Sequence, residues 1–358
     1  MRAPLPLLLA FSVGCALSGC GAVQVPAERE DAFTAAVAAQ RAGRPVEAMA
    51  AAYGYVREAT VDDPRYDRAL RLLALAAEDL GLRHAASLWF LEVARGRRAP
   101  ALLPEAIRGL QRALQGPHDA DALVTGYLAV ADIPGLPEDL QGFVDFQQGL
   151  HAARQGLDDW ADTRFARLPP GSQWADRAEY VRAVRLVSVR ALPAARALLE
   201  RLLARGEVLP RDLALDVRRS LARLDLHAGD FSSAIEHFRL LQAEAPGDPE
   251  LLLEMAWAHY QAGDTRRTLG LLLALDAPIY SDLIAPDRFL LEALALRRLC
   301  QFSPARAAAV RLDEAHGAAL RDLYAGVPAL RSPSLRVAAR RRPEVKPLSD
   351  LAQALEAE

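Results

Sequence analysis

A short motif recurs in this chain at an interval of 34 residues, and the repetition limits the folds that the chain can adopt. Gly229-Asp230 leads to Ala234, and a second Gly263-Asp264 stands 34 positions further on. A fixed interval of this size is typical of repeat proteins, in which one small helical or strand unit is stacked many times. Because a single unit cannot bury its own apolar side, the folded body must be an array of neighbouring units.

The residues around this motif resemble the tetratricopeptide repeat. Alanine at Ala234 is followed by an aromatic at Phe238 and a proline at Pro246, and the next unit carries Thr268 in place of the alanine. In that family the glycine marks the turn between two antiparallel helices, and the alanine marks their close crossing. Weaker copies of the pattern are Gly43 with Ala48, Gly81 with Ala86 and Phe90, Gly109 with Gly116, Gly149 and Gly156 with Ala161 and Phe165, Arg190 and Leu192 with Ala195 and Leu199, and Cys300 and Phe302 with Ala305.

The resemblance implies an all-α fold, a right-handed superhelical solenoid of about eight TPR-like antiparallel helix pairs over residues 28–325. The composition agrees, because 52% of the residues are hydrophobic but only 6% are aromatic, and alanine and leucine favour helices. Periodic apolar runs predict helices at residues 70–80, 213–226, 251–260 and 289–299. No segment predicts a strand.

The N-terminal residues have the features of an export signal. Arg2 precedes an apolar run that ends near Leu17, and this run is shorter than the roughly 20 residues that span a bilayer. The run leads into Leu17-Ser18-Gly19-Cys20, which resembles the lipobox of bacterial lipoproteins. That resemblance implies a signal peptide at residues 1–19, palmitate or a related acyl chain on Cys20, and a lipidated tether at residues 20–27.

The same resemblance implies a location. The residue after Cys20 is Gly21 and not aspartate, which in this lipoprotein family favours the outer membrane, with the body facing the periplasm. Three alternatives stay open: an ordinary cleaved signal with chance cysteines, an uncleaved signal anchor, and acylation at Cys15. Ser12 stands where a lipobox ending at Cys15 would need an aliphatic residue.

Residues 326–358 differ from the repeats, because prolines interrupt them and three arginines follow one another at residues 340–342. We expect a Pro- and Arg-containing tail that ends in a short helix with Ser349 as its N-cap. One interpretation is a solvated tail. The other is a segment that docks on a partner or on anionic lipid headgroups, for which a larger basic cluster is usual.

The residues needed for several kinds of catalysis are absent from the sequence. Lys346 is the only lysine, so phosphate-loop and Schiff-base chemistry would both depend on a residue of the tail. Cys300 lies alone beside Phe302, and we predict that it is a small buried apolar residue. His227 and His237 lie ten residues apart without a metal-binding pattern. We therefore expect no enzyme activity, no metal site and no cofactor.

The resemblance to tetratricopeptide repeats implies protein binding along a concave face formed by the first helix of each pair. The family's inward positions correspond here to Arg177, Tyr180, Arg219, Arg223, His227, Glu254, Trp257, Tyr260 and Gln261. Arg219 and Arg223 lie one helical turn apart, and guanidinium groups pair with carboxylates, so we predict that they recognise a carboxylate of the partner. The alternative for Trp257 and Tyr260 is packing between helices.

These inferences predict a non-catalytic periplasmic scaffold, tethered to the outer membrane, that holds other envelope proteins or peptide segments. It would bind no nucleic acid and no small-molecule substrate. The net charge of −3 agrees with the absence of nucleic-acid binding, which usually needs a basic surface. Residues 287–306 also loosely resemble repeat proteins of gliding delta-proteobacteria. Two alternatives are an outer-membrane protein assembly factor and the accessory solenoid of a peptidoglycan-processing enzyme.

Overall fold

The computed structural model describes the chain except for residues 1–26, 97, 116–126, 130, 281–284 and 341–344. The predicted signal peptide, Cys20 and nearly all of the tether lie outside the described residues. Within the described part, the secondary structure is entirely helical and contains no strand, as the sequence predicts. No helix in that part is long and apolar enough to cross a membrane.

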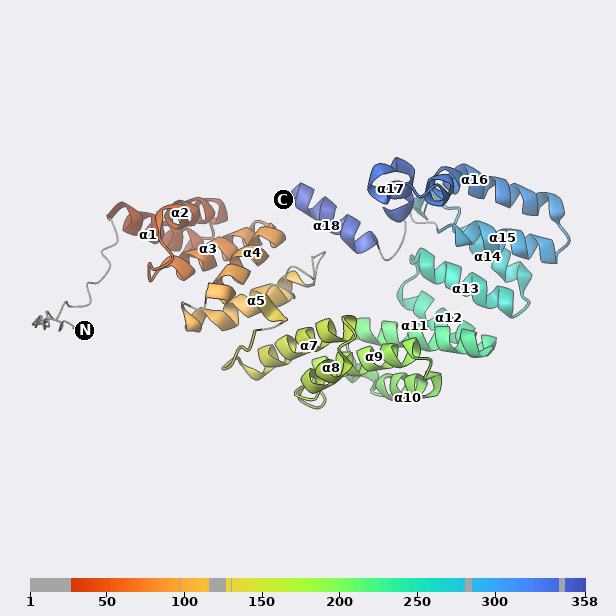
Figure 1. Ribbon diagram of the computed structural model, residues 1–358, viewed down its shortest axis with the longest axis horizontal. Helices are drawn as coiled ribbons and strands as arrows, with labels where there is room; N and C mark the ends of the chain where they lie inside the picture. The colour runs from red at the N-terminus through yellow and green to blue at the C-terminus, as the bar shows by residue number, and fades with distance from the viewer. Residues whose placement is uncertain (1–26, 97, 116–126, 130, 281–284, 341–344) are drawn as a thin grey trace, which may run out of the picture.

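Antiparallel helix pairs follow one another along the chain (Figure 1). The four helices whose apolar runs were predicted from the sequence are α3, α11, α13 and α15. The helices are α1 (Ala27–Arg41), α2 (Pro45–Glu58), α3 (Tyr66–Asp79), α4 (Arg83–Gly96), α5 (Leu103–Ala113), α7 (Glu138–Arg154), α8 (Asp158–Phe165), α9 (Gln173–Ser188), α10 (Leu192–Leu203), α11 (Arg211–Ala228), α12 (Phe231–Glu244), α13 (Pro249–Gln261), α14 (Thr265–Ala274), α15 (Asp287–Arg298), α16 (Phe302–Tyr324), α17 (Pro333–Arg340) and α18 (Lys346–Ala357).

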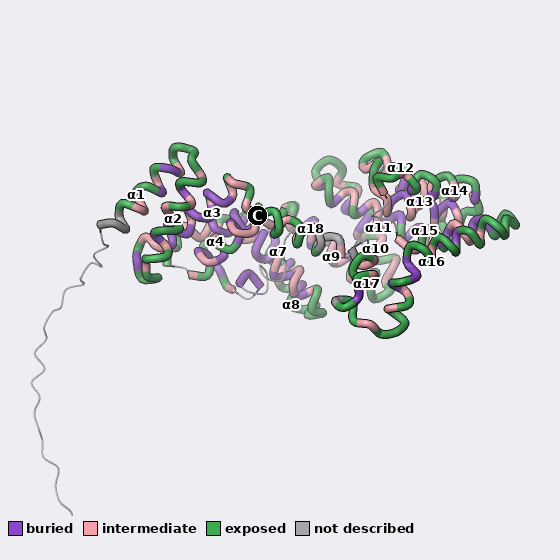
Figure 2. Tube along the Cα trace, turned by 90° about the horizontal axis from the view of Figure 1, so that it is seen from above, coloured by how far each residue is buried: buried purple, intermediate pink, exposed green. Residues whose placement is uncertain are grey.

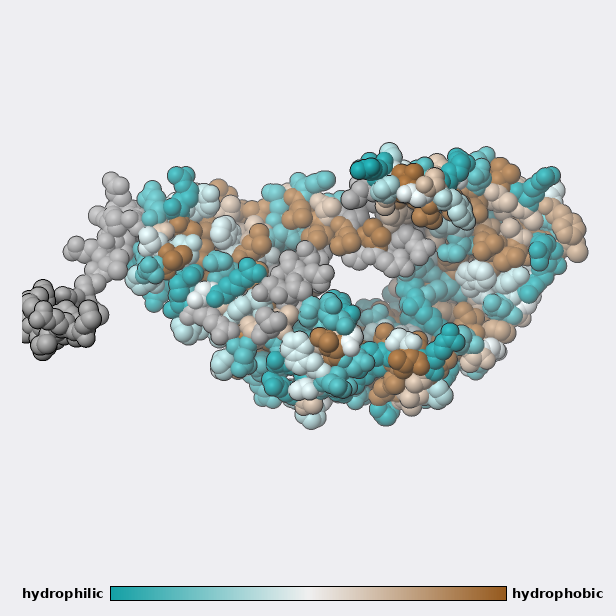
Figure 3. All heavy atoms as spheres, viewed as in Figure 1, coloured by the Kyte–Doolittle hydropathy of each residue, from teal (hydrophilic) through white to brown (hydrophobic). Residues whose placement is uncertain are grey.

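The pairs are arranged in an arc around an open space, which we call the hollow (Figure 1). Helices α7 and α9 lie toward the hollow, and their partners α8 and α10 lie on the outer side of the arc. The space-filling view leaves the centre of the hollow open (Figure 3). Buried residues run along the array between neighbouring helices, and exposed residues cover its outside (Figure 2). The core is thus a series of interfaces between successive pairs.

The turn between the two helices of a pair has the same backbone form in successive units. In the best-matched unit, the N–H of Asp230 donates to the carbonyl of Asp225, and Gly229 has a left-handed φ of 82°. This is the Schellman arrangement, in which the residue after the helix adopts a conformation that suits glycine. Arg190 and Cys300 occupy the equivalent position in their units with φ values of 61° and 58°.

The position of Cys300 corrects one prediction. The sequence context suggested a buried apolar residue, but the cysteine is exposed. It is the left-handed residue that ends α15, so its side chain lies outside the apolar face of that helix. The apolar neighbours in the sequence belong to the two helices that the turn connects.

Replacing Cys300 with glycine is expected to stabilise the protein. A side chain in the left-handed region destabilises the folded state by about 1–2 kcal/mol. Glycine avoids this cost, but its greater freedom favours the unfolded chain by about 0.5–1 kcal/mol. The free energy of unfolding of C300G, measured by urea titration, should therefore rise by about 0.5–1 kcal/mol. The matched change G229A should lower it, and a C300G variant less stable than the natural chain would contradict the strain argument.

The small residue five positions after the turn is buried where the sequence predicts a helix crossing. Ala48, Ala161, Ala195 and Ala234 are fully buried, and Ala86 is nearly so. Thr268, which replaces the alanine in one unit, is also buried, because its hydroxyl donates to the carbonyl of Asp264. Ala305 is the exception. In α16 the fully buried alanine is Ala308, so this helix packs one turn away from the expected position.

The C-terminal tail contains two helices. The hydroxyls of Ser332 and Ser334 donate to the carboxylate of Asp322 on α16, at 2.6 Å each, and fix the start of α17. Helix α18 begins at Lys346, three residues before the predicted start. Ser349 therefore lies inside the helix and is not its N-cap, because the proline at position 347 suits the first turn of a helix.

Candidate partner-binding groove

An apolar recess lies between the first helices α9 and α11. Its volume is about 580 Å³, which is within the range of known ligand pockets. Its walls come from one face of each helix, and its floor comes from α10 behind them. The lining residues are Tyr180, Ala183, Val184, Val187, Arg190, Leu192, Leu199, Ser220, Arg223, Leu224 and His227.

A second recess continues this one toward the end of α13. Arg223 and His227 line both recesses, and Phe231 and Gln261 lie at the far side of the second. The two recesses therefore share a wall, and we refer to them together as the groove. It is lined by residues of three successive helix pairs, over which an extended segment could lie.

The chemistry of the groove is apolar at the floor and basic at the rim. Leu192 and Leu199 of α10 form the floor with the buried Leu224 of α11 beside them, and the exposed Arg190, Arg223 and His227 stand at the edge. No carboxylate belongs to the first recess. Such a surface suits an apolar side chain that has an acidic group nearby.

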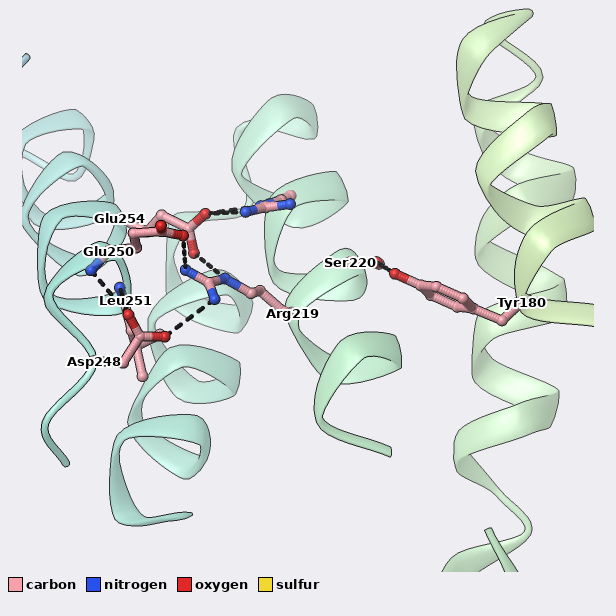
Figure 4. A network of polar contacts seen from close by, with 8 residues as sticks. Tyr180, Arg219, Ser220, Asp248, Glu250, Leu251 and Glu254 are labelled. Carbon is pink, nitrogen blue, oxygen red and sulfur yellow. Dashed lines mark hydrogen bonds and ion pairs between the residues drawn. The ribbon is translucent and has the colours of Figure 1, made fainter. Parts of the chain in front are cut away.

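One hydrogen bond joins the two walls of the groove. The hydroxyl of Tyr180 on α9 lies 3.1 Å from the hydroxyl of Ser220 on α11 (Figure 4). Burial raises the pKa of Tyr180 above its ordinary value, although the contact with Ser220 acts in the opposite direction. Tyr180 is therefore a neutral, half-buried wall residue that keeps α9 and α11 in register.

Arg219 lies in an ion-pair network between α11 and α13 (Figure 4). Arg223 joins the same network through Glu254. The guanidinium of Arg219 contacts the carboxylates of Glu254 at 2.8 Å and Asp248 at 3.1 Å, and that of Glu250 at 3.5 Å. Arg223 contacts the same Glu254 at 2.5 Å. Burial alone would lower the pKa of Arg219, but the three carboxylates outweigh it and raise that pKa.

The ion pair between Arg219 and Glu254 joins residues that lie about one repeat length apart, and other ion pairs in the array do the same. Ion pairs join residues 34 or 35 positions apart, so equivalent positions of neighbouring units meet. They are Arg71 with Glu105, Arg112 with Glu78, Arg177 with Asp212 and Arg219 with Glu254. Charged residues on the first helices therefore connect one unit to the next.

The structure divides the predicted partner-binding residues into two groups. Tyr180, Arg223, His227 and Gln261 line the groove. Arg177, Arg219 and Glu254 are engaged in contacts between units, and Arg223 also contacts Glu254 while it lines the groove. Trp257 and Tyr260 pack partly buried beside α14, and the guanidinium of Arg298 lies 4.1 Å from the Tyr260 ring centre. Carboxylate recognition by Arg219 and Arg223 stays a prediction, and reversing both charges would also break the contact with α13.

The sequence-based prediction missed the apolar part of the groove. Val184 and Val187 lie on the exposed face of α9, and Leu192 and Leu199 come from the second helix α10. A signal was present, because Val184 and Val187 place large apolar side chains on an exposed face of a first helix. Arg190, which the sequence-based prediction also missed, is the left-handed residue in the turn after α9.

The ionisable groups of the described residues form no cluster of three or more that could hold a metal ion. His237 instead faces the buried carboxylate of Asp225, with 3.6 Å between Nε2 and the nearer oxygen. Burial lowers the pKa of His237, and Asp225 only partly offsets this effect. The imidazole is therefore neutral near pH 7.

Comparison with known proteins adds little to these observations. No family model and no curated protein matches the chain. A tetratricopeptide repeat protein from Parabacteroides merdae aligns with 80% of this chain and 92% of its own, at 13% identity and a TM-score of 0.36. A human IFIT1 dimer with PPP-AAAA aligns with 91% of this chain and 80% of its own, at 14% identity and a TM-score of 0.42.

A third solved structure is PilW, described as a widely conserved type IV pilus biogenesis factor. It aligns with 72% of this chain and 96% of its own, at 15% identity and a TM-score of 0.25. Because all three TM-scores are below 0.5, the conclusion about the fold depends on the helix packing of this chain itself. That packing shows an α-helical solenoid built from antiparallel pairs.

Proposed function

We propose that this chain is a non-catalytic scaffold that holds a segment of another protein in the groove between α9, α11 and α13. The observation that carries the proposal is an apolar recess of about 580 Å³ between α9 and α11, with a basic rim and no acidic lining residue. An apolar side chain of the partner would fill the floor, and a neighbouring carboxylate would meet Arg190 or Arg223. Buried apolar area supplies the affinity, and the arginines select the charge.

A peptide-display selection on the purified protein tests this proposal. We expect the enriched sequences to combine a large apolar residue with an acidic one. The variant V187E places a negative charge at the wall of the groove, and it should weaken binding of the selected peptides by about tenfold or more, since a buried unpaired charge is costly. Val208 is exposed outside the groove, so V208E is the matched control. Equal binding by both variants would reject the groove as the site.

We further propose that the scaffold is fixed to the outer membrane through acyl chains on Cys20 and faces the periplasm. The sequence Leu17-Ser18-Gly19-Cys20 and the following Gly21 support this. Several acyl chains would give stable anchoring, which a single chain does not. Partners in that location are other envelope proteins.

Metabolic labelling with a clickable palmitate analogue tests the anchor. The natural chain should take up the label, C20S should lose it, and C15S should keep it. If C20S still takes up the label, the acylated residue is not Cys20. If the natural chain is unlabelled, the proposed anchor is rejected.

A further inference from the structure

The last helix, α18, crosses the hollow and reaches back to the first half of the array. Figure 1 shows it between α17 and α4, and Figure 2, which looks down on it, shows it over α7 and α9. At its far end the side chain of Glu358 accepts hydrogen bonds from the backbone N–H groups of His84 at 2.6 Å and Ala85 at 3.1 Å. These residues are 274 and 273 positions apart in the sequence.

The two N–H groups belong to the first turn of α4, where a helix has donors without internal partners. Leu82 precedes the helix, and its side chain has no acceptor. By contrast, α12 and α14 carry their own caps, because Asp230 and Asp264 accept from N–H groups of the next turn. A residue of the C-terminal tail thus fills on α4 the role that a local aspartate fills in those units.

Two leucines of α18 are exposed to solvent. Leu348 is 61% exposed and Leu355 is 53% exposed, so these two apolar side chains are not buried in a core. Among the described residues, the carboxylate of Glu358 makes the hydrogen bonds between α18 and α4. A capping side chain shifts a local equilibrium by about fivefold to tenfold, which makes such a contact reversible.

We propose that α18 is a strap that closes the open side of the solenoid, with Glu358 on α4 as its releasable end. The inference rests on the proposed function, because it assigns to the strap control over entry into the groove. While the strap is closed, α18 lies across the hollow opposite α9, one wall of the groove. When Glu358 leaves α4, the way to the groove widens and a partner segment enters faster.

Hydrogen exchange of the full chain tests the strap without any partner. E358A removes the cap, so the amides of His84 and Ala85 should exchange about five to ten times faster. Glu356 lies exposed on the same helix, and E356A is the matched control with the same loss of charge. The strap is rejected if E358A and E356A exchange alike at these two amides.

The association rate of a groove-binding peptide from the display selection tests the gating. We expect E358A to bind such a peptide several times faster than E356A, with a similar dissociation rate. Faster exchange in E358A together with equal association rates would overturn the gating. If no peptide binds either variant, the proposed function fails, while the exchange experiment still decides whether the strap exists.

Discussion

Replacing Arg196 with alanine is expected to lower the free energy of unfolding by about 3 kcal/mol, because it leaves a buried charge without its partner. The carboxylate of Asp225 on α11 is only 2% exposed and is ion-paired with Arg196 on the preceding helix α10. Its second oxygen has no hydrogen-bond partner. Without the guanidinium, a negative charge would remain inside the interface between two helix pairs.

Urea titration of three further variants separates this effect from a general loss of charge. R211A removes an ion pair with Glu244 in which both side chains are well exposed, so it should change stability by less than about 1 kcal/mol. The double variant R196A/D225N removes the stranded charge and should recover part of the loss. If R196A and R211A were equally mild, the buried ion pair would not support the interface.

The loss in R196A should also depend on pH. His237 faces Asp225, and burial lowers its pKa in the natural protein, so near pH 7 it is neutral and cannot replace Arg196. Without Arg196, protonation of His237 next to a bare carboxylate becomes favourable. A histidine whose pKa is raised in the folded state stabilises that state most at pH values below its unfolded pKa of about 6.5. The loss of unfolding free energy in R196A should therefore shrink as the pH falls from 7.5 to 5.5.

Replacing Phe238 with alanine should cost even more, about 4 kcal/mol, because it removes a large side chain from a closed interface. Phe238 is completely buried and belongs to a cluster with Ala222, Leu251 and Met255, which come from α11 and α13. It thus fills the space between two successive pairs. In a linear array this damage is local, so amides of α11–α14 should exchange faster than those of α1–α4.

The matched change is F302A. Phe302 is 66% exposed at the start of α16, so the same substitution should cost less than about 1 kcal/mol. Thermal unfolding followed by calorimetry would measure both variants. Similar losses for F238A and F302A would contradict the assignment of Phe238 to an interface between units.

The features that could be predicted from the sequence are local or periodic. Gly229 and Gly263 mark turns because their backbone conformation is a property of single residues, and Ala234 and Phe238 mark crossings because each unit repeats the same contact. Cys300 was misjudged for a related reason. The template expects glycine there, and composition alone does not reveal that another residue adopts the same left-handed φ.

The groove was only partly predictable because it is formed between units. Tyr180 and Arg223 could be inferred from the positions that face inward, but the contribution of Leu199 depends on how α10 packs behind α9 and α11. The partners of Arg219 lie in the next unit. A search for opposite charges one repeat apart would have paired Arg219 with Glu254, and would have shown that this arginine is engaged within the chain.

Site-specific photo-crosslinking in the native cells tests the central claim most directly. A photoreactive residue at Val184, which is exposed in the groove, is compared with one at Val208, which is exposed outside it. We predict a discrete protein adduct at position 184 that V187E abolishes, and none at position 208. No adduct at position 184, or the same adduct at both positions, would contradict the claim that this solenoid holds a protein segment in the groove.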